Sequence, residues 1–142
     1  MTFIDHGKWQ PYTPATLPPG VPSGALFVRR ESDGIDWYDY VKDGGNFSPD
    51  TVKFTALWHP TYQSYLVGAA VYDVTLLFPP NQLVREITDY AGSDPQADFG
   101  SKLYDPATDA FSDLPPFEPP VQREIRELRD RVAALEAKQG GA

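Results

Sequence analysis

The C-terminal segment, residues 121–142, repeats apolar residues at spacings that alternate between four and three positions. This alternation is a heptad repeat, which places one narrow apolar stripe along a helix. Because so narrow a stripe matches the seam of a coiled coil, the segment is predicted to bind copies of itself and to make the chain an oligomer. The seam consists of Ile125 and Val132 at the a positions and Val121, Leu128 and Leu135 at the d positions.

Charged residues flank this seam in a complementary order. Glu124 and Arg131 occupy g positions, and Arg129 and Glu136 occupy e positions. In a parallel coiled coil, each g residue meets the next e residue of a neighbouring chain, which pairs Glu124 with Arg129 and Arg131 with Glu136. Because both pairs are attractive, the pattern predicts parallel rather than antiparallel packing.

The number of chains is indicated by two features that disagree. Residues 131–136 read Arg-Val-Ala-Ala-Leu-Glu, which is similar to the Arg-h-x-x-h-Glu signature of short parallel trimeric coiled coils, where h is apolar. In contrast, β-branched residues at a with leucine at d favour two strands. We predict a homotrimer, with a dimer as the alternative and a single helix docked on its own domain as the third interpretation.

The composition limits the classes of partner. A chain of 142 residues fits one domain with appendages, and the absence of cysteine excludes disulfides and thiolate metal sites. Residues 1–120 carry 7 basic and 16 acidic residues, a balance of −9 that disfavours nucleic-acid binding. The longest apolar stretch, residues 65–78, contains Asp73 and is shorter than the roughly 20 residues that a membrane span needs. A soluble protein without a membrane or nucleic-acid partner is expected.

The N-terminal segment, residues 1–24, holds five prolines and three glycines. Proline lacks the backbone N–H that helices and sheets require, so the segment is predicted to be an extended arm with polyproline character. Its apolar residues indicate an arm that binds along a surface, either of a partner or of its own domain. The candidate partner-binding residues are Phe3, Ile4, Trp9, Tyr12 and Leu17.

Residues 25–114 are predicted to form a β domain, because short apolar or alternating runs are separated by turn residues. The expected strands are 25–28, 35–41, 51–58, one or two within 62–78, 83–90, and a final hairpin of 102–104 and 110–111. The predicted fold is mainly β, a small antiparallel sandwich or barrel. A Pro-rich spacer, residues 115–120, then leads to the helix, with Pro120 suited to its first turn.

Alternation within the expected strands assigns side chains to faces. In residues 35–41, Trp37 is predicted to point inward, and Tyr38 and Tyr40 lie on the opposite face. In residues 51–58, the inward set is Val52, Phe54, Ala56 and Trp58. Tyr38 and Tyr40 are therefore the candidate residues for stacking against a ligand. The aromatic residues assigned to the core are Trp37, Trp58, Tyr62 and Tyr65.

We find no sequence pattern for catalysis. His6 and His59 are not part of a zinc-binding motif, and no nucleophile elbow or phosphate-binding glycine loop is present. The pairs Asp94/Asp98 and Asp105/Asp109 have a spacing of four, unlike the alternating ligands of a calcium-binding EF-hand loop. No catalytic residue, metal or cofactor is predicted.

The order of arm, β domain, Pro-rich spacer and short coiled coil resembles small tail, collar, fibre or head-decoration proteins of tailed bacteriophages. Residues 104–111, Tyr-Asp-Pro-Ala-Thr-Asp-Ala-Phe, are similar to segments of tail-fibre-type proteins. The resemblance implies a structural, non-enzymatic homotrimer, assembled in the host cytoplasm, bound to other virion proteins and anchored by its N-terminal arm. The alternative is a trimeric carbohydrate- or receptor-binding module that uses its exposed aromatic residues.

Overall fold

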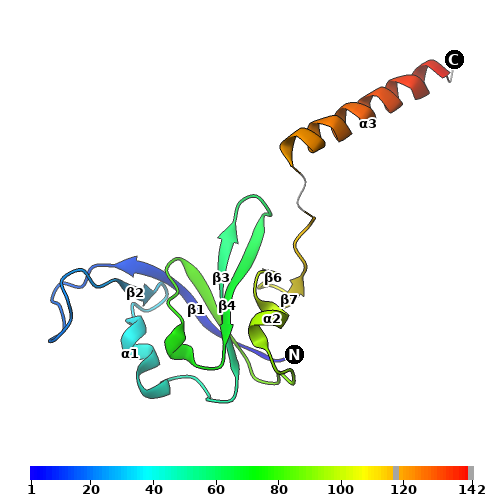
Figure 1. The fold of residues 1–142 in the computed structure, drawn as a ribbon. Coiled ribbons are helices and arrows are strands. Elements are labelled where there is room, and N and C mark those ends of the chain that lie inside the picture. The colour runs from blue at the N-terminus through cyan, green and yellow to red at the C-terminus, as the bar shows by residue number, and fades with distance from the viewer. Residues whose placement is uncertain (117–118, 141–142) are drawn as a thin grey trace.

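The structure is a computed structural model that describes residues 1–116 and 119–140, and Figure 1 shows its fold. The described chain contains a seven-stranded sheet in which every neighbouring pair is antiparallel. A mainly β fold with a C-terminal helix is thereby confirmed. In their order across the sheet, the strands are β2 (Phe27–Arg30), β1 (Phe3–Tyr12), β5 (Gln82–Ile87), β3 (Val52–His59), β4 (Ser64–Val71), β6 (Leu103–Asp105) and β7 (Ala110–Ser112).

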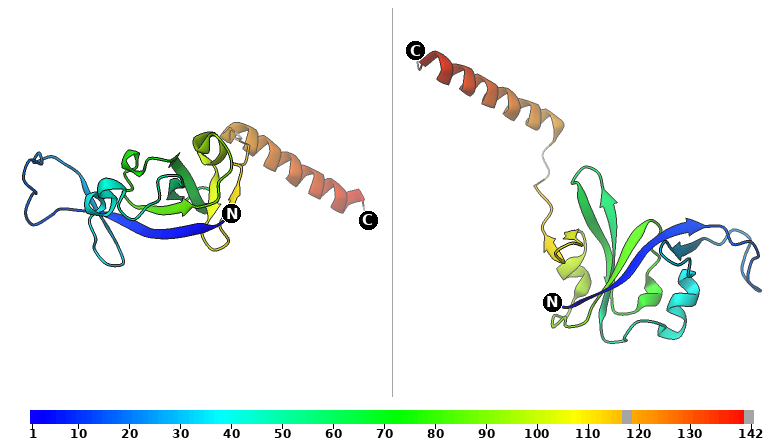
Figure 2. Two further views of the ribbon diagram at one scale, coloured as in Figure 1. Left: turned by 90° about the horizontal axis from the view of Figure 1, so that it is seen from below. Right: turned by 180° about the vertical axis from the view of Figure 1, so that it is seen from behind.

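The sheet is curled but open, so it is neither the closed barrel nor the two-sheet sandwich that the sequence suggested. The N-terminal end of β1 lies close to β7 in each view of Figures 1 and 2, although four strands separate the two in the sheet. The rings of Phe3 on β1 and Phe111 on β7 have centroids 5.9 Å apart. Because the curl brings the two ends together over an apolar interior, no second sheet is needed to cover that face.

Each face of the sheet carries its own apolar cluster. The first cluster fills the inside of the curl, and Phe99 of α2 (Pro95–Phe99) packs into it. The second lies on the other face, beneath α1 (Trp37–Val41) and two short 3-10 turns, η1 (Lys42–Gly44) and η2 (Val74–Leu76). Its fully buried side chains include Trp9, Val28 and Val84.

The structure differs from the prediction of an extended arm over residues 1–24. Residues 3–12 form β1, which pairs with both β2 and β5, so the β domain begins near residue 3 instead of residue 25. The pairing with β5 shifts between Asp5 and Lys8, where Gly7 has φ +89°, a left-handed conformation that favours glycine. Pro11 lies in the short pairing with β2. Glycine and proline have a low propensity for strands, but the burial of Trp9 between them outweighs that cost.

The strand predicted over residues 35–41 is wrong, because this segment contains the helix α1. Asp36 begins the helix by accepting hydrogen bonds from the backbone N–H groups of Tyr38 (2.9 Å) and Asp39 (3.4 Å). Trp37, Tyr40 and Val41, which have helical spacing, are buried. The predicted exposure of Tyr40 is therefore wrong as well. In a run this short, the same apolar residues fit both the alternation of a strand and the spacing of a helix. The N-cap residue Asp36 favours the helix.

The other strand predictions agree with the structure to within a few residues. Strands occur at 27–30, 52–59 and 82–87, and the hairpin of β6 and β7 encloses the predicted turn. The long apolar run over residues 62–78 holds one strand, β4, followed by η2. Helix α2 was not foreseen.

The C-terminal helix is α3 (Pro120–Gly140), and it begins at the predicted proline. Figures 1 and 2 show it standing apart from the sheet. Over residues 1–116 and 119–140, no helix is both long and apolar enough to cross a membrane.

Candidate interaction surfaces

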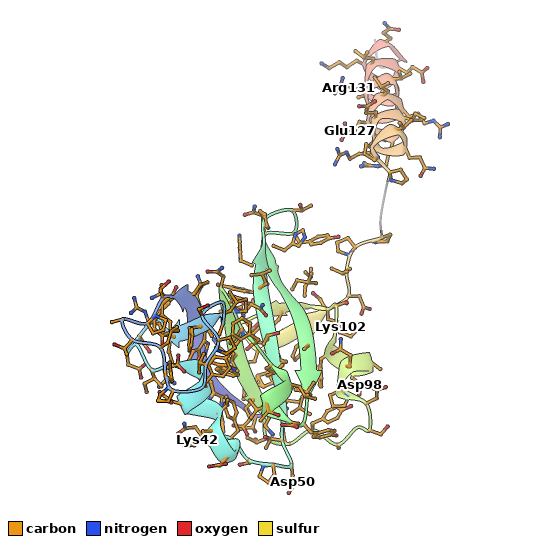
Figure 3. The ribbon with its side chains drawn as sticks, turned by 60° about the vertical axis from the view of Figure 1, so that its left-hand side comes forward. Lys42, Asp50, Asp98, Lys102, Glu127 and Arg131 are labelled. Atoms are coloured by element: carbon orange, nitrogen blue, oxygen red, sulfur yellow. The ribbon has the colours of Figure 1, made fainter. Side chains whose placement is uncertain are left out.

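The predicted seam of α3 is a continuous apolar stripe that residues 1–116 and 119–140 of the same chain leave exposed. Figure 3 shows the side chains of α3 projecting into solvent on all sides. Docking of the helix on its own domain, the third interpretation, finds no support in this arrangement. The exposed fractions are 67% for Val121, 44% for Ile125, 56% for Leu128, 52% for Val132 and 59% for Leu135.

Part of the seam surrounds a hollow on the surface of α3. Ile125, Leu128, Arg129 and Val132 stand at positions i, i+3, i+4 and i+7 and border a shallow hollow. Four residues at this spacing form the hole that receives an apolar side chain from a facing helix. The flanking charges Glu124, Arg129, Arg131 and Glu136 are also on α3 and exposed, where a neighbouring chain can reach them.

The candidate partner-binding residues of the N-terminal segment differ in burial, because some of them lie in β1. Trp9 is fully buried, so its side chain is not available to a partner, and Phe3 is partly buried against the first cluster. The Tyr12 hydroxyl donates to Asp36 Oδ2 at 2.5 Å. Ile4 and Leu17 remain 43% and 41% exposed. The interpretation of an arm that packs on its own domain is thus correct for residues 3–12, and the burial of Trp9 contradicts a partner-binding role for that residue.

The two candidate stacking residues are in different environments. Tyr40 is buried, with its hydroxyl 2.7 Å from His6 Nδ1. Tyr38 is 48% exposed, and its hydroxyl donates to the carbonyl of Leu26 at 3.0 Å. Tyr38 borders a groove of about 460 Å³ whose further lining includes Tyr12, Phe27, Asp36 and Asp39.

A buried polar network connects β1, α1 and β5, and the sequence did not reveal it. His6 Nε2 lies 2.9 Å from Glu86 Oε1, and the other ring nitrogen contacts Tyr40. A neutral imidazole satisfies both contacts when Nε2–H donates to the carboxylate and Nδ1 accepts from the Tyr40 hydroxyl. Glu86 Oε2 accepts from the backbone N–H of Ser48 at 3.0 Å and from the Thr51 hydroxyl.

The environment of the network shifts the pKa of its members. Burial lowers the pKa of His6, against the opposing effect of Glu86. For Glu86, burial alone raises the pKa, but hydrogen bonds from Thr51, His6 and the Ser48 backbone outweigh it and hold the pKa below its usual range. His6 and Glu86 are 3% and 1% exposed. A network closed to solvent and satisfied internally fixes the packing of β1 and offers no access to a substrate.

Lys53 extends this buried polar region. Its side chain is 1% exposed, and burial lowers the pKa of its amine. Its Nζ donates to the carbonyls of Thr51 at 2.9 Å and Tyr72 at 2.6 Å, and also to that of Ser48. The three carbonyls take up all three donors of the ammonium group.

The end of the β3–β4 hairpin is a further exposed apolar region that the sequence did not indicate. Trp58 was predicted to point into the core, but it is 46% exposed and its ring contacts that of Tyr65, with centroids 5.3 Å apart. Leu57, on the opposite side of β3, is 47% exposed. The prediction that Val52, Phe54 and Ala56 point inward is correct. The strand continues past the core, so its last residues lie outside the apolar interior.

The aspartates considered for calcium have local roles. Two accept hydrogen bonds from backbone N–H groups, and two accept from tyrosine hydroxyls. Across residues 1–116 and 119–140, no three histidine, aspartate or glutamate side chains gather as a metal site. The aspartates are Asp94 and Asp105 in the first role and Asp98 and Asp109 in the second.

No protein-family model, curated protein or solved structure matches this chain. The surfaces described above are therefore the basis for assigning a function.

Proposed function

We propose that this protein is a non-enzymatic structural protein in which α3 forms a parallel trimeric coiled coil and holds three β domains at one end. The observation that supports the proposal is the exposure of all five seam residues, between 44% and 67%, on one side of a helix. Charged residues at e and g positions complement one another across a parallel seam. A contiguous apolar stripe with a charged rim is typical of a protein–protein interface. If the stripe stayed exposed to water, its apolar residues would not stabilise the protein.

The energetic gain from the seam is moderate. Fully burying a leucine, isoleucine or valine side chain contributes about 1.5–3 kcal/mol, so covering five half-exposed residues contributes roughly 5 kcal/mol per chain. Association itself costs about 4–15 kcal/mol in lost translational and rotational freedom. The two are of similar size, so α3 directs association and a second contact has to strengthen it.

The setting that we propose is the virion of a tailed bacteriophage, where symmetric sites receive oligomeric structural proteins. The arrangement of a small β domain, a Pro-rich spacer and a short heptad helix supports this setting, as does the resemblance of residues 104–111. Anchoring through Phe3 and Trp9 no longer fits, because both pack in the β domain. The exposed candidates left for attachment are Ile4 on β1 and Leu17 in the loop of residues 13–24, and we propose the loop as the anchor.

The mass of the full chain in solution tests the self-association. Sedimentation equilibrium is expected to give the mass of three chains. The double variant Leu128→Asp/Val132→Asp places charges in the seam and is expected to give the mass of one chain with an unchanged melting temperature of the β domain. The matched control, Ala134→Asp/Ala137→Asp, adds the same charge at c and f positions and is expected to remain trimeric. A single-chain mass for the unaltered protein would overturn the proposal.

Attachment has its own test. Replacing residues 13–24 with a short Gly-Ser turn keeps the pairing of β1 with β2, so a folded trimer is expected. If the loop is the anchor, this variant no longer co-sediments with the particle, whereas Leu76→Ser, on the turn η2 outside the loop, still does. Undiminished co-sedimentation would exclude the loop.

A ligand-binding module is the second candidate, and the groove beside Tyr38 is the observation that favours it. A volume of about 460 Å³ with three aromatic rings and a few polar groups falls within the range of small-molecule sites. Binding to an oligosaccharide array that is lost in Tyr38→Ala and kept in Tyr72→Ala would support this function. Tyr72 is 40% exposed and does not line the groove, so it is a suitable control.

A further inference from the structure

The end of the β3–β4 hairpin combines exposed apolar side chains with an absence of charge. It extends from the domain on the side where the chain leaves for α3 (Figures 1 and 3). Residues 54–72 contain no aspartate, glutamate, lysine or arginine, in a chain where 23% of residues are charged. Leu57 and Trp58 are 47% and 46% exposed, and they point to opposite faces because they are neighbours on a strand.

An uncharged row crosses the sheet from this hairpin. Leu57 of β3 pairs with Leu66 of β4, which pairs with Leu103 of β6, so the three leucines share the face opposite the first cluster. Gln82 of β5 and Ser112 of β7 continue the row at its two ends. The hairpin therefore has a leucine face, made of Leu57, Leu66 and Leu103, and an aromatic face on its other side.

The aromatic face consists of Trp58 and Tyr65. The two residues pair across β3 and β4, and their rings meet edge to face at 5.3 Å. Tyr65 is partly buried against the first cluster, so the outer surface of this face is mainly the indole of Trp58.

The charge of the domain indicates what covers these faces. Residues 1–120 carry a balance of −9, so two copies repel each other at most orientations. The uncharged hairpin is the end at which acidic copies approach with least repulsion. Exposed strand edges are commonly protected from association by charged residues. At the end of this hairpin, β3 extends past Leu57, its last residue paired with β5, and carries no charged residue there. The occupant that fits is a second copy of the same chain.

Two apolar faces on opposite sides of one hairpin fit a ring better than a two-fold pair. In a two-fold dimer the same patch meets itself, which leaves the second face uncovered. In a closed ring, one face of each copy meets the other face of the next, and both are covered. The hairpin geometry thus agrees with three chains.

We propose that, in the trimer held by α3, the leucine face of each hairpin packs on the aromatic face of the next copy. This inference rests on the proposed self-association through α3. The coiled coil raises the effective concentration of the hairpins, and the hairpin ring supplies the second contact that the short helix lacks. The spacer before α3 starts close to β7, on the hairpin side of the domain, so the two contacts form one interface along the trimer axis.

Charge substitutions on the two faces test this packing. Leu57→Asp and Trp58→Lys are each expected to weaken trimerisation of the full chain, measured by sedimentation over a dilution series, by about tenfold or more. The control is Leu76→Asp on η2, which is 70% exposed and is expected to leave trimerisation unchanged. Melting temperatures of the β domain, followed by circular dichroism, confirm that each variant is folded before its association is compared.

The double variant Leu57→Asp/Trp58→Lys distinguishes a ring from other contacts. The two introduced side chains point to opposite faces of β3, so they cannot pair within one chain. In the ring, the carboxylate introduced on the leucine face of one copy meets the ammonium group introduced on the aromatic face of the next, and the two attract each other. The double variant is therefore expected to trimerise more tightly than the sum of the single effects allows.

Two outcomes would overturn the ring and leave the α3 trimer standing. One is a double variant whose trimerisation is weakened by the sum of the two single effects. The other is an effect of Leu57→Asp no larger than that of Leu76→Asp. A single-chain mass for the unaltered protein would overturn both the ring and the α3 trimer.

Discussion

The β domain has two apolar clusters that are buried within one chain, whereas α3 exposes its apolar residues. Trp9, Phe54 and Tyr104 are fully buried, and every seam residue of α3 is at least 44% exposed. The helix is also a poor candidate for stability alone, because short isolated helices are marginal in water. The difference teaches that the core of the β domain is complete within a single chain. In contrast, the apolar stripe of α3 is explained only when other chains pack beside it.

The largest expected effect tests whether residues 1–12 belong to the β domain. Trp9 contacts the rings of Trp37 and Tyr40 at 4.8 and 5.2 Å, and its indole N–H donates to the His6 carbonyl. Trp9→Ala is expected to lower the free energy of unfolding by about 3–5 kcal/mol, measured by urea denaturation. The control, Leu17→Ala in the exposed loop, is expected to change it by less than about 0.5 kcal/mol. Equal effects would mean that β1 is a loosely held arm.

A smaller effect is expected from the buried network. Glu86→Gln keeps the size of the side chain but removes the charge that accepts hydrogen bonds from His6, Ser48 and Thr51. The expected loss of stability is about 1–3 kcal/mol, because buried donors lose their acceptor. Asp50→Asn, at an exposed carboxylate in the adjoining loop, is the matched control and is expected to be neutral. A neutral Glu86→Gln would show that the network does not fix β1.

The same network predicts how stability depends on pH. The pKa of His6 in the folded domain lies below its ordinary value of 6.5, and the pKa of Glu86 lies below its ordinary value of 4.5. Each group binds its proton less readily when folded, so its stabilising contribution is complete above the unfolded pKa and is lost as pH falls. The free energy of unfolding is therefore expected to decrease from about pH 7 to about pH 5 through His6.

Two histidine variants separate this effect from general acid sensitivity. His6→Asn is expected to be less stable at neutral pH but to lose little further stability down to about pH 5. His59→Asn removes a partly exposed histidine and is expected to keep the pH dependence of the unaltered chain. If His59→Asn abolished the dependence and His6→Asn did not, the assignment to the network would be wrong.

The features that sequence revealed are those that depend on neighbours along the chain. The heptad of α3 and the alternation of β3 are local patterns, and both elements were predicted close to their observed bounds. Helical spacing alone places the five candidate seam residues on one side of α3, so their shared exposure could be predicted from the sequence. The hairpin of β6 and β7 was found through its Asp105–Pro106 turn.

The features that sequence concealed depend on distant partners. β1 lies between β5 and β2, and its Gly7 and Pro11 suggest a loop until those partners are known. His6 meets Glu86 across 80 positions, which no spacing predicts. Trp58 is exposed because β3 extends past the core. The alternation along β3 therefore predicted the face on which Trp58 lies, but not the exposed fraction of its side chain. Helix α1 does not follow this rule, because its N-cap residue, Asp36, is a signal that depends only on neighbouring residues.

The smallest expected effect concerns the rim of the α3 seam, and it separates a trimer determined by the helix from one determined by the hairpins. Arg131 and Glu136 flank Val132 and Leu135, and an exposed ion pair of this kind contributes about 0.2–1 kcal/mol. Arg131→Ala is expected to weaken trimerisation slightly and to shift part of the population to dimer at low ionic strength. Lys138→Ala, which removes a charge beyond the last seam residue, is the control. Sedimentation of both variants at low and high salt measures the effect, which is expected to shrink as salt screens the pair. An unchanged proportion of trimer in Arg131→Ala would mean that residues 131–136 do not select three chains, and the hairpin ring would then set the number.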